Sequence, residues 1–242
     1  MERLENIQFL APFKFYGNTP RTIKWNAVAF RTKEGLKVEV SLVSDIKRHN
    51  GTMEHMLHFT GVVYLSRLQT LAESKAIPPR WNKKPSVFSE DIYKLYFHGP
   101  SFQVLDAAQS FEGKVIGKFN KNLLGLPADE PGLFTTPLLI ELCFQTAGLF
   151  EVGATGILAL PQSVGSLKIY RTPVNGVPIF AEVKPRHING RYSFDARVVD
   201  SRGNVFLELT DYQTSPLPYP AELRLVEPLK ILVESADNLE ER

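Results

Sequence analysis

Residues 137–149, PLLIELCFQTAGL, decide the fold of this 242-residue chain. Apolar side chains fill most of the stretch, a pattern that is typical of a helix buried on nearly all sides. Glu141 and Gln145 interrupt it, and their spacing of four puts both side chains on one helical face. A carboxylate inside a core is costly unless it is paired or used. Glu141 is therefore either a functional group or a structural polar group satisfied by Gln145 and the backbone.

The segments around this helix alternate as strands do. Thr135 or Thr136 is expected to cap the helix, Pro137 suits its first turn, and we expect it to end before Gly153. Residues 111–119 alternate as a strand does, and the glycines at 113 and 117 suggest a bulge or a close backbone approach within it. The other predicted strands cover residues 23–32, 36–42, 58–65, 166–171, 177–184, 192–200 and 205–213. One central helix wrapped by an antiparallel sheet is an α+β fold.

Composition excludes several classes of function. The net charge is +2, with 28 basic and 26 acidic residues, which gives no electrostatic reason to expect nucleic acid or an anionic membrane as partner. Cys143 is the one cysteine, so no intramolecular disulfide is expected, and its apolar neighbours predict a buried thiol. Neither a membrane-spanning run nor a signal peptide is recognised, which favours the cytoplasm. No His/Cys spacing suggests a metal site.

Several segments together resemble one family. The stretch 137–149 resembles the central helix of hotdog-fold β-hydroxyacyl carrier-protein dehydratases. In the dehydratase domains of polyketide and polyunsaturated fatty acid synthases, LYFHGPSFQVL (95–105) resembles the opening of the second hotdog, and LPQSVGSLKIYR (160–171) the strand after its helix. IQFLAPFKFYGNTPRTI (7–23) and HFTGVV (58–63) resemble later strands of the first hotdog.

The resemblance implies a double hotdog whose first half is incomplete. The expected division is a partial N-terminal hotdog over 1–74, a linker over 75–90, a complete C-terminal hotdog over 91–220 and a charged tail over 221–242. The first hotdog lacks its opening strand, its central helix and the family's His-x-x-x-Gly-x-x-x-x-Pro segment, since no histidine precedes His49. On this resemblance the chain is similar to a dehydratase domain cut near its N-terminus, or to a naturally shortened relative.

The same resemblance implies a reaction, the dehydration of a β-hydroxyacyl chain on acyl carrier protein to the trans-enoyl thioester. Glu141 would be the acid, Gln145 would orient it or hold a water, and His98 is the best candidate to replace the missing family histidine. No cofactor is implied, because the phosphopantetheine of the carrier protein holds the substrate. The residues implied to bind substrate are Tyr96, Phe97, Gly99, Pro100, Phe102 and Gly148.

Other readings of the same fold remain open from the sequence. The chain is alternatively a non-catalytic hotdog module that binds acyl chains or carrier protein, or an isomerase, cyclase or thioesterase. The expected partners are acyl carrier protein and other synthase domains, with no nucleic acid and no membrane. A homodimer is also expected, because strands within 23–66 would lack a helix over their apolar face.

Overall fold

The computed structural model describes residues 3–15, 20–47, 51–66, 74–82, 84–123, 136–173, 176–188 and 190–237. Within them, one antiparallel sheet has the strand order β2-β3-β4-β1-β8-β11-β10-β9-β7-β6-β5. Its strands are β1 (Arg3–Phe9), β2 (Ile23–Arg31), β3 (Gly35–Lys47), β4 (Met53–Ser66), β5 (Val87–Phe88), β6 (Leu105–Phe111), β7 (Lys114–Phe119), β8 (Ile157–Ile169), β9 (Ile179–Ile188), β10 (Arg191–Asp200) and β11 (Val205–Pro220). The predicted α+β class with an antiparallel sheet around a central helix is confirmed.

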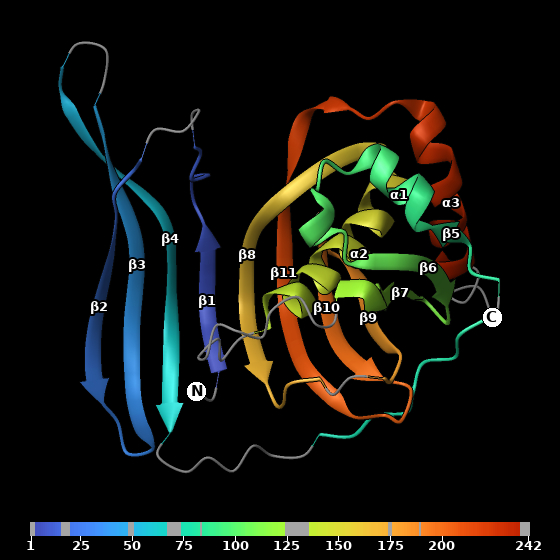
Figure 1. Cartoon of the computed structure of the whole chain (residues 1–242), viewed down its shortest axis with the longest axis horizontal. Coiled ribbons are helices and arrows are strands. Elements are labelled where there is room, and N and C mark those ends of the chain that lie inside the picture. The colour runs from blue at the N-terminus through green and yellow to red at the C-terminus, as the bar shows by residue number, and fades with distance from the viewer. Residues whose placement is uncertain are drawn as a thin grey trace.

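The central helix is α2 (Pro137–Thr155), and the strands from β8 to β5 curve around it (Figure 1). Thr136 precedes it without a side-chain capping bond, while Thr135 lies outside the described residues. The predicted end before Gly153 is wrong, because the helix continues to Thr155 and Gly156 closes it at φ 71°. Among the described residues α2 alone is long and apolar enough to cross a membrane, and its place inside the sheet explains that composition.

A second helix closes the open side of the wrapped body, which is the helix α2 together with the strands from β8 to β5 that curve around it. α3 (Leu223–Asp237) packs on α2, and Val226, Leu229 and Leu232 on one of its faces are fully buried. The backbone carbonyl of Leu229 lies 2.8 Å from where a Cβ of Gly153 would be, so glycine lets the two helices approach closely. Most of the expected charged tail, 221–242, is therefore a packed amphipathic helix, whose apolar spacing of three places one stripe toward the core.

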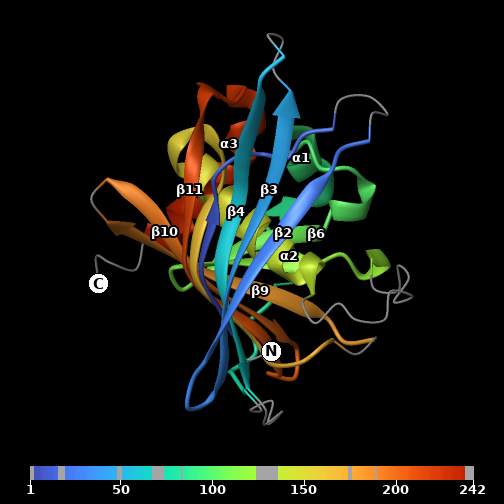
Figure 2. The same cartoon turned by 90° about the vertical axis from the view of Figure 1, so that its left-hand side faces the viewer.

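Four strands extend beyond the wrapped body. β2, β3, β4 and β1 form a twisted arm that joins the rest of the sheet where β1 pairs with β8 (Figures 1 and 2). The register puts Trp25, Leu42 and Phe59 side by side on one face, with Leu36 next to Leu65 further along it. Trp25, Leu36 and Leu65 are exposed, and no helix of the described residues covers this face.

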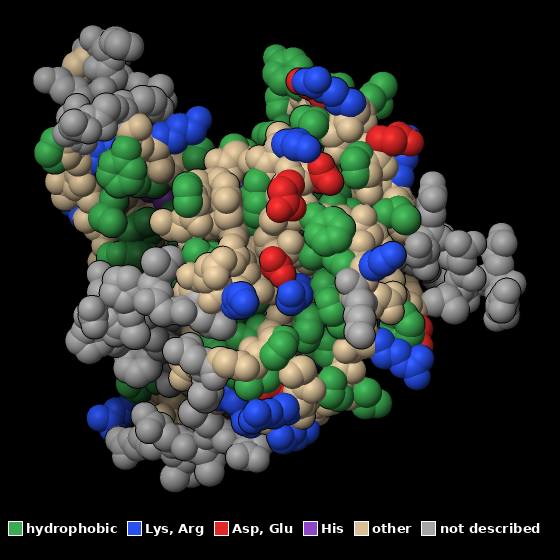
Figure 3. All heavy atoms as spheres, turned by 45° about the vertical axis from the view of Figure 1, so that its right-hand side comes forward, with side chains coloured by type: hydrophobic (Ala, Val, Ile, Leu, Met, Phe, Trp, Pro, Cys, Tyr) green, Lys and Arg blue, Asp and Glu red, His purple; other side chains and the backbone are tan. Residues whose placement is uncertain are grey.

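The proline-rich segment between the arm and the wrapped body lies against the sheet. The Ala76 N–H donates to the Gly203 carbonyl at 2.9 Å, and the Trp81 ring packs on Phe180. The short strand β5 and helix α1 (Ser89–Leu95) follow directly, so regular structure begins inside the expected linker 75–90. On the face drawn in Figure 3, acidic and basic side chains are interspersed with apolar ones, in line with the nearly balanced charge.

Candidate functional site

Glu141 and Gln145 meet one turn apart on α2, as their spacing predicts. The Gln145 amide donates through Nε2 to Glu141 Oε1 at 2.8 Å. Gln145 is 3% exposed, whereas the Glu141 side chain is 21% exposed. The apolar neighbours of Glu141 in the sequence suggested that its carboxylate would be sealed in the core. The carboxylate instead faces a cavity at the edge of the core. Within the described part of the chain the polar contacts of this carboxylate are made by Oε1, so Oε2 is available to a ligand.

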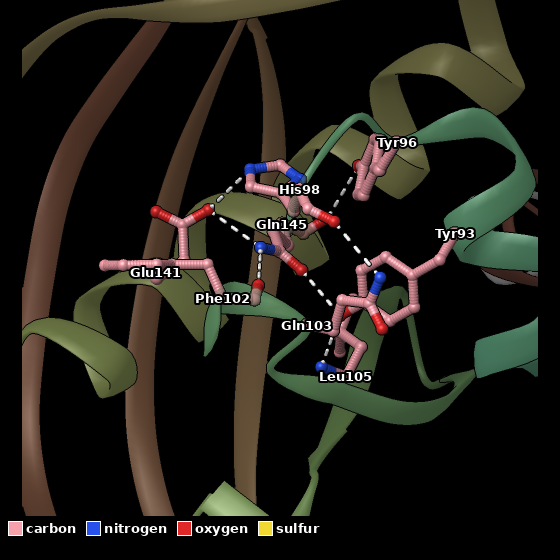
Figure 4. A network of polar contacts seen from close by, with 8 residues as sticks. All are labelled: Tyr93, Tyr96, His98, Phe102, Gln103, Leu105, Glu141 and Gln145. Carbon is pink, nitrogen blue, oxygen red and sulfur yellow. Dashed lines mark hydrogen bonds and ion pairs between the residues drawn. The ribbon is translucent and has the colours of Figure 1, made fainter. Parts of the chain in front are cut away.

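Hydrogen bonds to both its nitrogen and its oxygen determine the orientation of the Gln145 amide. Its Nε2 also donates to the Phe102 carbonyl at 2.8 Å, and its Oε1 accepts from the Tyr93 hydroxyl at 2.9 Å. Tyr93 in turn accepts from the Leu105 N–H at 2.7 Å. Burial raises the pKa of Tyr93, and the Glu141 carboxylate raises it further, so this hydroxyl remains a donor. The amide consequently has one orientation, and it presents an N–H to Glu141 (Figure 4).

His98 reaches the same carboxylate from the loop after α1. Its Nε2 lies 3.0 Å from Glu141 Oε1, and its side chain is 23% exposed (Figure 4). Its backbone carbonyl accepts from the Gln103 amide at 3.1 Å, and its ring stacks on Phe97 and meets Tyr96 edge-on. Nδ1 is buried without a hydrogen-bond partner among the described residues. The imidazole is thus held by packing, and the carboxylate is its one polar contact within the residues that the structure describes.

Tyr96 ties the loop to the helix behind this pair. Its hydroxyl donates to the backbone carbonyl of Gln145 at 2.9 Å, and burial keeps the pKa of Tyr96 well above its usual range. Gly148 makes this approach possible, because a Cβ there would lie 2.6 Å from the Tyr96 hydroxyl. Gly148, implied by the resemblance to bind substrate, thus allows a close approach of Tyr96 to the helix.

A cavity of about 250 Å³ opens beside the pair. Of the residues implied to bind substrate, Tyr96, Phe97 and Gly148 line it together with His98, Glu141 and Gln145. Gly99 and Pro100 do not line it, and Phe102 contributes its carbonyl to Gln145 instead. The lining residues that the sequence reasoning missed are Phe144, Leu158, Ala159, Leu160, Pro161, Tyr212, Thr214 and Leu217.

The chemistry of the site is that of an acid–base pair at the mouth of an apolar pocket. A carboxylate and an imidazole in contact can exchange a proton, and the cavity gives a ligand access to both. Cys143, predicted to be a buried thiol, is fully buried, and burial raises its pKa far above the usual range. No group of three or more His, Cys, Asp or Glu side chains within the described ranges could hold a metal ion.

Comparison with known proteins gives a consistent family. The family model "Polyketide synthase dehydratase N-terminal domain" matches residues 84–224. The dehydratase domain from the CurF module of curacin polyketide synthase superimposes with a TM-score of 0.69 at 18% identity, covering 89% of this chain and 76% of that one. No curated protein matches the chain.

Two solved variants of another such domain also match. The CurK dehydratase described as inactive with a histidine replaced by phenylalanine gives a TM-score of 0.61 at 17% identity, with 89% of this chain and 75% of that one covered. The CurK dehydratase described as inactive with an aspartate replaced by asparagine gives a TM-score of 0.59 at 15% identity, with 88% of this chain and 74% of that one covered. These similarities confirm the predicted hotdog fold for the chain.

Proposed function

This chain belongs to the dehydratase family of polyketide synthases, and we propose that Glu141 and His98 carry out its dehydration reaction on a β-hydroxyacyl thioester. The observation that supports this most is the 3.0 Å contact between His98 Nε2 and Glu141 Oε1 on the wall of the cavity. A module that only bound acyl chains would have no use for a paired acid and base there. The contact therefore favours catalysis over a passive binding role.

In the proposed mechanism the pair holds one proton, with neutral His98 and protonated Glu141 as the reactive form. His98 Nε2 removes a proton from the α-carbon, and the electrons of that C–H bond become the new carbon–carbon double bond. The β-carbon–oxygen bond breaks as Glu141 protonates the departing hydroxyl, which leaves as water. The products are the trans-enoyl thioester, an imidazolium and a carboxylate.

The same contact restores the starting state. After the reaction, His98 carries the proton taken from the substrate, and Glu141 has lost its own. Transfer from Nε2 to Oε1 across their 3.0 Å separation returns both groups to their reactive forms without solvent. Gln145 acts as a positioning residue here, because its N–H holds Oε1 in place through each proton transfer.

The described relatives support a need for both kinds of group. The CurK dehydratase is described as inactive when a histidine is replaced and when an aspartate is replaced. In this chain we assign the role of the imidazole to His98 and the role of the carboxylate to Glu141. The imidazole proposed here lies in the loop after α1, whereas the family's histidine lies in a His-x-x-x-Gly-x-x-x-x-Pro segment.

The partners follow from the family. A polyketide synthase dehydratase works with carrier protein and with other synthase domains. We propose that the substrate arrives on the phosphopantetheine arm of acyl carrier protein, that the reaction is cytoplasmic, and that two copies associate through the exposed apolar face of β2–β4. Light scattering tests the last point, and a monodisperse monomer that binds no hydrophobic dye would contradict it.

The assay that tests the function measures enoyl thioester formation from a β-hydroxyacyl pantetheine. Glu141→Gln keeps the shape of the side chain but cannot deliver a proton, and His98→Phe keeps a ring but no base. Since general acid–base groups contribute about 10²–10⁴-fold each, we expect either variant to lose at least about 100-fold in kcat. His187→Phe is the control, since His187 lies on β9 outside the cavity. Unchanged turnover in Glu141→Gln would refute the assignment.

A further inference from the structure

A second acidic side chain of α2 is buried and has no part in the proposed proton transfers. Glu151 is 8% exposed, and the hydroxyl of Thr214 on β11 lies 2.7 Å from each of its carboxylate oxygens. Burial raises the pKa of Glu151, and the hydrogen bond from Thr214 opposes part of that rise. A carboxylate taken out of water is costly unless a partner or a task compensates it, which raises the question of what this one does.

Thr214 connects the carboxylate to the reaction cavity. It lines the same cavity as Glu141 and Gln145, whereas Glu151 lies behind it. Glu141 and Glu151 are ten positions apart on one helix, which corresponds to about 15 Å along its axis. The cavity wall around Thr214 includes the apolar side chains of Leu158, Leu160 and Leu217 and the phenol of Tyr212. The Thr214 hydroxyl is therefore the aliphatic hydroxyl of a largely apolar wall, and it is bonded to Glu151 rather than to the acid–base pair.

The pairing leaves Thr214 able to bind a ligand in either protonation state of Glu151. When Glu151 is ionised, Thr214 donates its proton to the carboxylate and keeps lone pairs that can accept from the cavity. When Glu151 is neutral, the carboxyl group can donate to Thr214, whose own proton is then free to turn toward the cavity. An all-carbon acyl chain would leave the remaining hydrogen-bonding capacity of this hydroxyl unused, while an oxygen-bearing chain would pair with it.

We propose that Thr214, supported by Glu151, selects β-hydroxyacyl chains that carry a hydroxyl or keto oxygen several carbons beyond the reacting carbon. This inference rests on the proposed function, because it concerns which substrate the Glu141–His98 pair receives. The ligand class is a partly reduced acyl chain that retains oxygen from earlier rounds of elongation. A fully reduced chain of equal length would be the poorer substrate.

The test compares pantetheine thioesters of equal chain length. The parent is a β-hydroxyacyl chain with no other oxygen, and each of the others carries one further hydroxyl, moved outward along the chain. At one position we expect kcat/KM to exceed that of the parent by about 10-fold, the size of one hydrogen bond in a buried site. Thr214→Val should reduce that ratio to about 1, and Thr214→Ser should preserve it.

The control is Thr210→Val, on the same strand but exposed, which should keep the wild-type ratio. If Thr214→Val does not fold, Thr214→Ala removes the hydroxyl without adding a methyl group and is expected to give the same ratio. A wild-type ratio near 1 at every position, or an unchanged ratio in Thr214→Val, would overturn the inference while leaving the dehydratase assignment intact.

A binding readout separates this inference from the proposed function. Saturated thioether analogues, with and without the distal hydroxyl, cannot react, so calorimetry reports their affinities even if the chain turns nothing over. The hydroxylated analogue should bind wild type about 10-fold more tightly than it binds Thr214→Val. Equal affinities would overturn the role of Thr214, and loss of turnover with the affinity difference intact would count only against the acid–base assignment.

Discussion

Gly148→Ala probes how closely the segment of Tyr96 and His98 after α1 is fitted to α2. A Cβ at position 148 would lie 2.6 Å from the Tyr96 hydroxyl, where ordinary contacts begin at 3.4 Å. The hydroxyl must retreat by about 0.8 Å, and its 2.9 Å bond to the Gln145 carbonyl is lost or distorted. Tyr96 is 9% exposed, so its ring has little room to move.

The expected change in stability is the balance of three terms. Overpacking a core costs about 1–3 kcal/mol, and the lost hydrogen bond about 0.5–1.5 kcal/mol. Alanine in a helix interior returns up to about 1 kcal/mol relative to glycine. We therefore expect Gly148→Ala to lower the free energy of unfolding by about 0.5–4.5 kcal/mol, with a shift in Tm of roughly 2–4 °C per kcal/mol for a chain of this size.

Activity should fall as well, because Tyr96 packs edge-on against the His98 ring at 5.4 Å. A displacement of this size near reacting groups typically costs about 10- to 100-fold in rate. Urea unfolding and the enoyl-formation assay measure the two effects. Gly99→Ala is the control for stability, since no atom lies within 4 Å of its would-be Cβ and its φ of −68° suits any residue. A Gly148→Ala protein as stable and as active as wild type would refute the reasoning.

Four further substitutions test other parts of the structure. Tyr93→Phe leaves the Gln145 amide oxygen without its donor, so urea unfolding should show a loss of about 1–3 kcal/mol. Asp200 is pushed toward a higher pKa by burial, but three N–H groups of the following turn hold its pKa below the usual range. Ionised Asp200 therefore adds to the free energy of unfolding above about pH 4, and this contribution is lost as the pH falls through the lowered pKa that Asp200 has in the folded state. The difference in unfolding free energy between wild type and Asp200→Asn should accordingly shrink in acid. Leu229→Ala should cost about 2–5 kcal/mol, whereas Leu223→Ala, at an exposed site, should cost less than about 0.5 kcal/mol.

The central helix and the pairing on it could be predicted because both depend on local spacing. A run of apolar residues indicates burial, and a separation of four places Glu141 beside Gln145 in any α-helix. Residues 111–119 hold the end of β6, a turn and β7 rather than one strand, although the close backbone approach expected at their glycines is found where Gly117 meets Thr146. The alternation of this segment hid the turn at Gly113, which adopts φ 71° between β6 and β7.

Other parts of the site could not be read from spacing at all. His98 reaches Glu141 across 43 positions of sequence, and its distance depends on how α1 and its loop pack on α2. Thr214 and Leu160 face the cavity because β11 pairs with β8 at that point of the sheet, which is a matter of register and not of local pattern. The charged end of the chain concealed the apolar stripe of α3 that buries Leu229.

The most direct test of the acid–base pair is a double-mutant cycle on dehydration by the purified chain. Kcat is measured for wild type, Glu141→Gln, His98→Phe and the double variant, with melting curves to confirm that each is folded. If the two groups act as one unit, the double variant should be no slower than the slower single variant, within about threefold. Two losses that multiply, or a His98→Phe variant as active as wild type, would contradict the account.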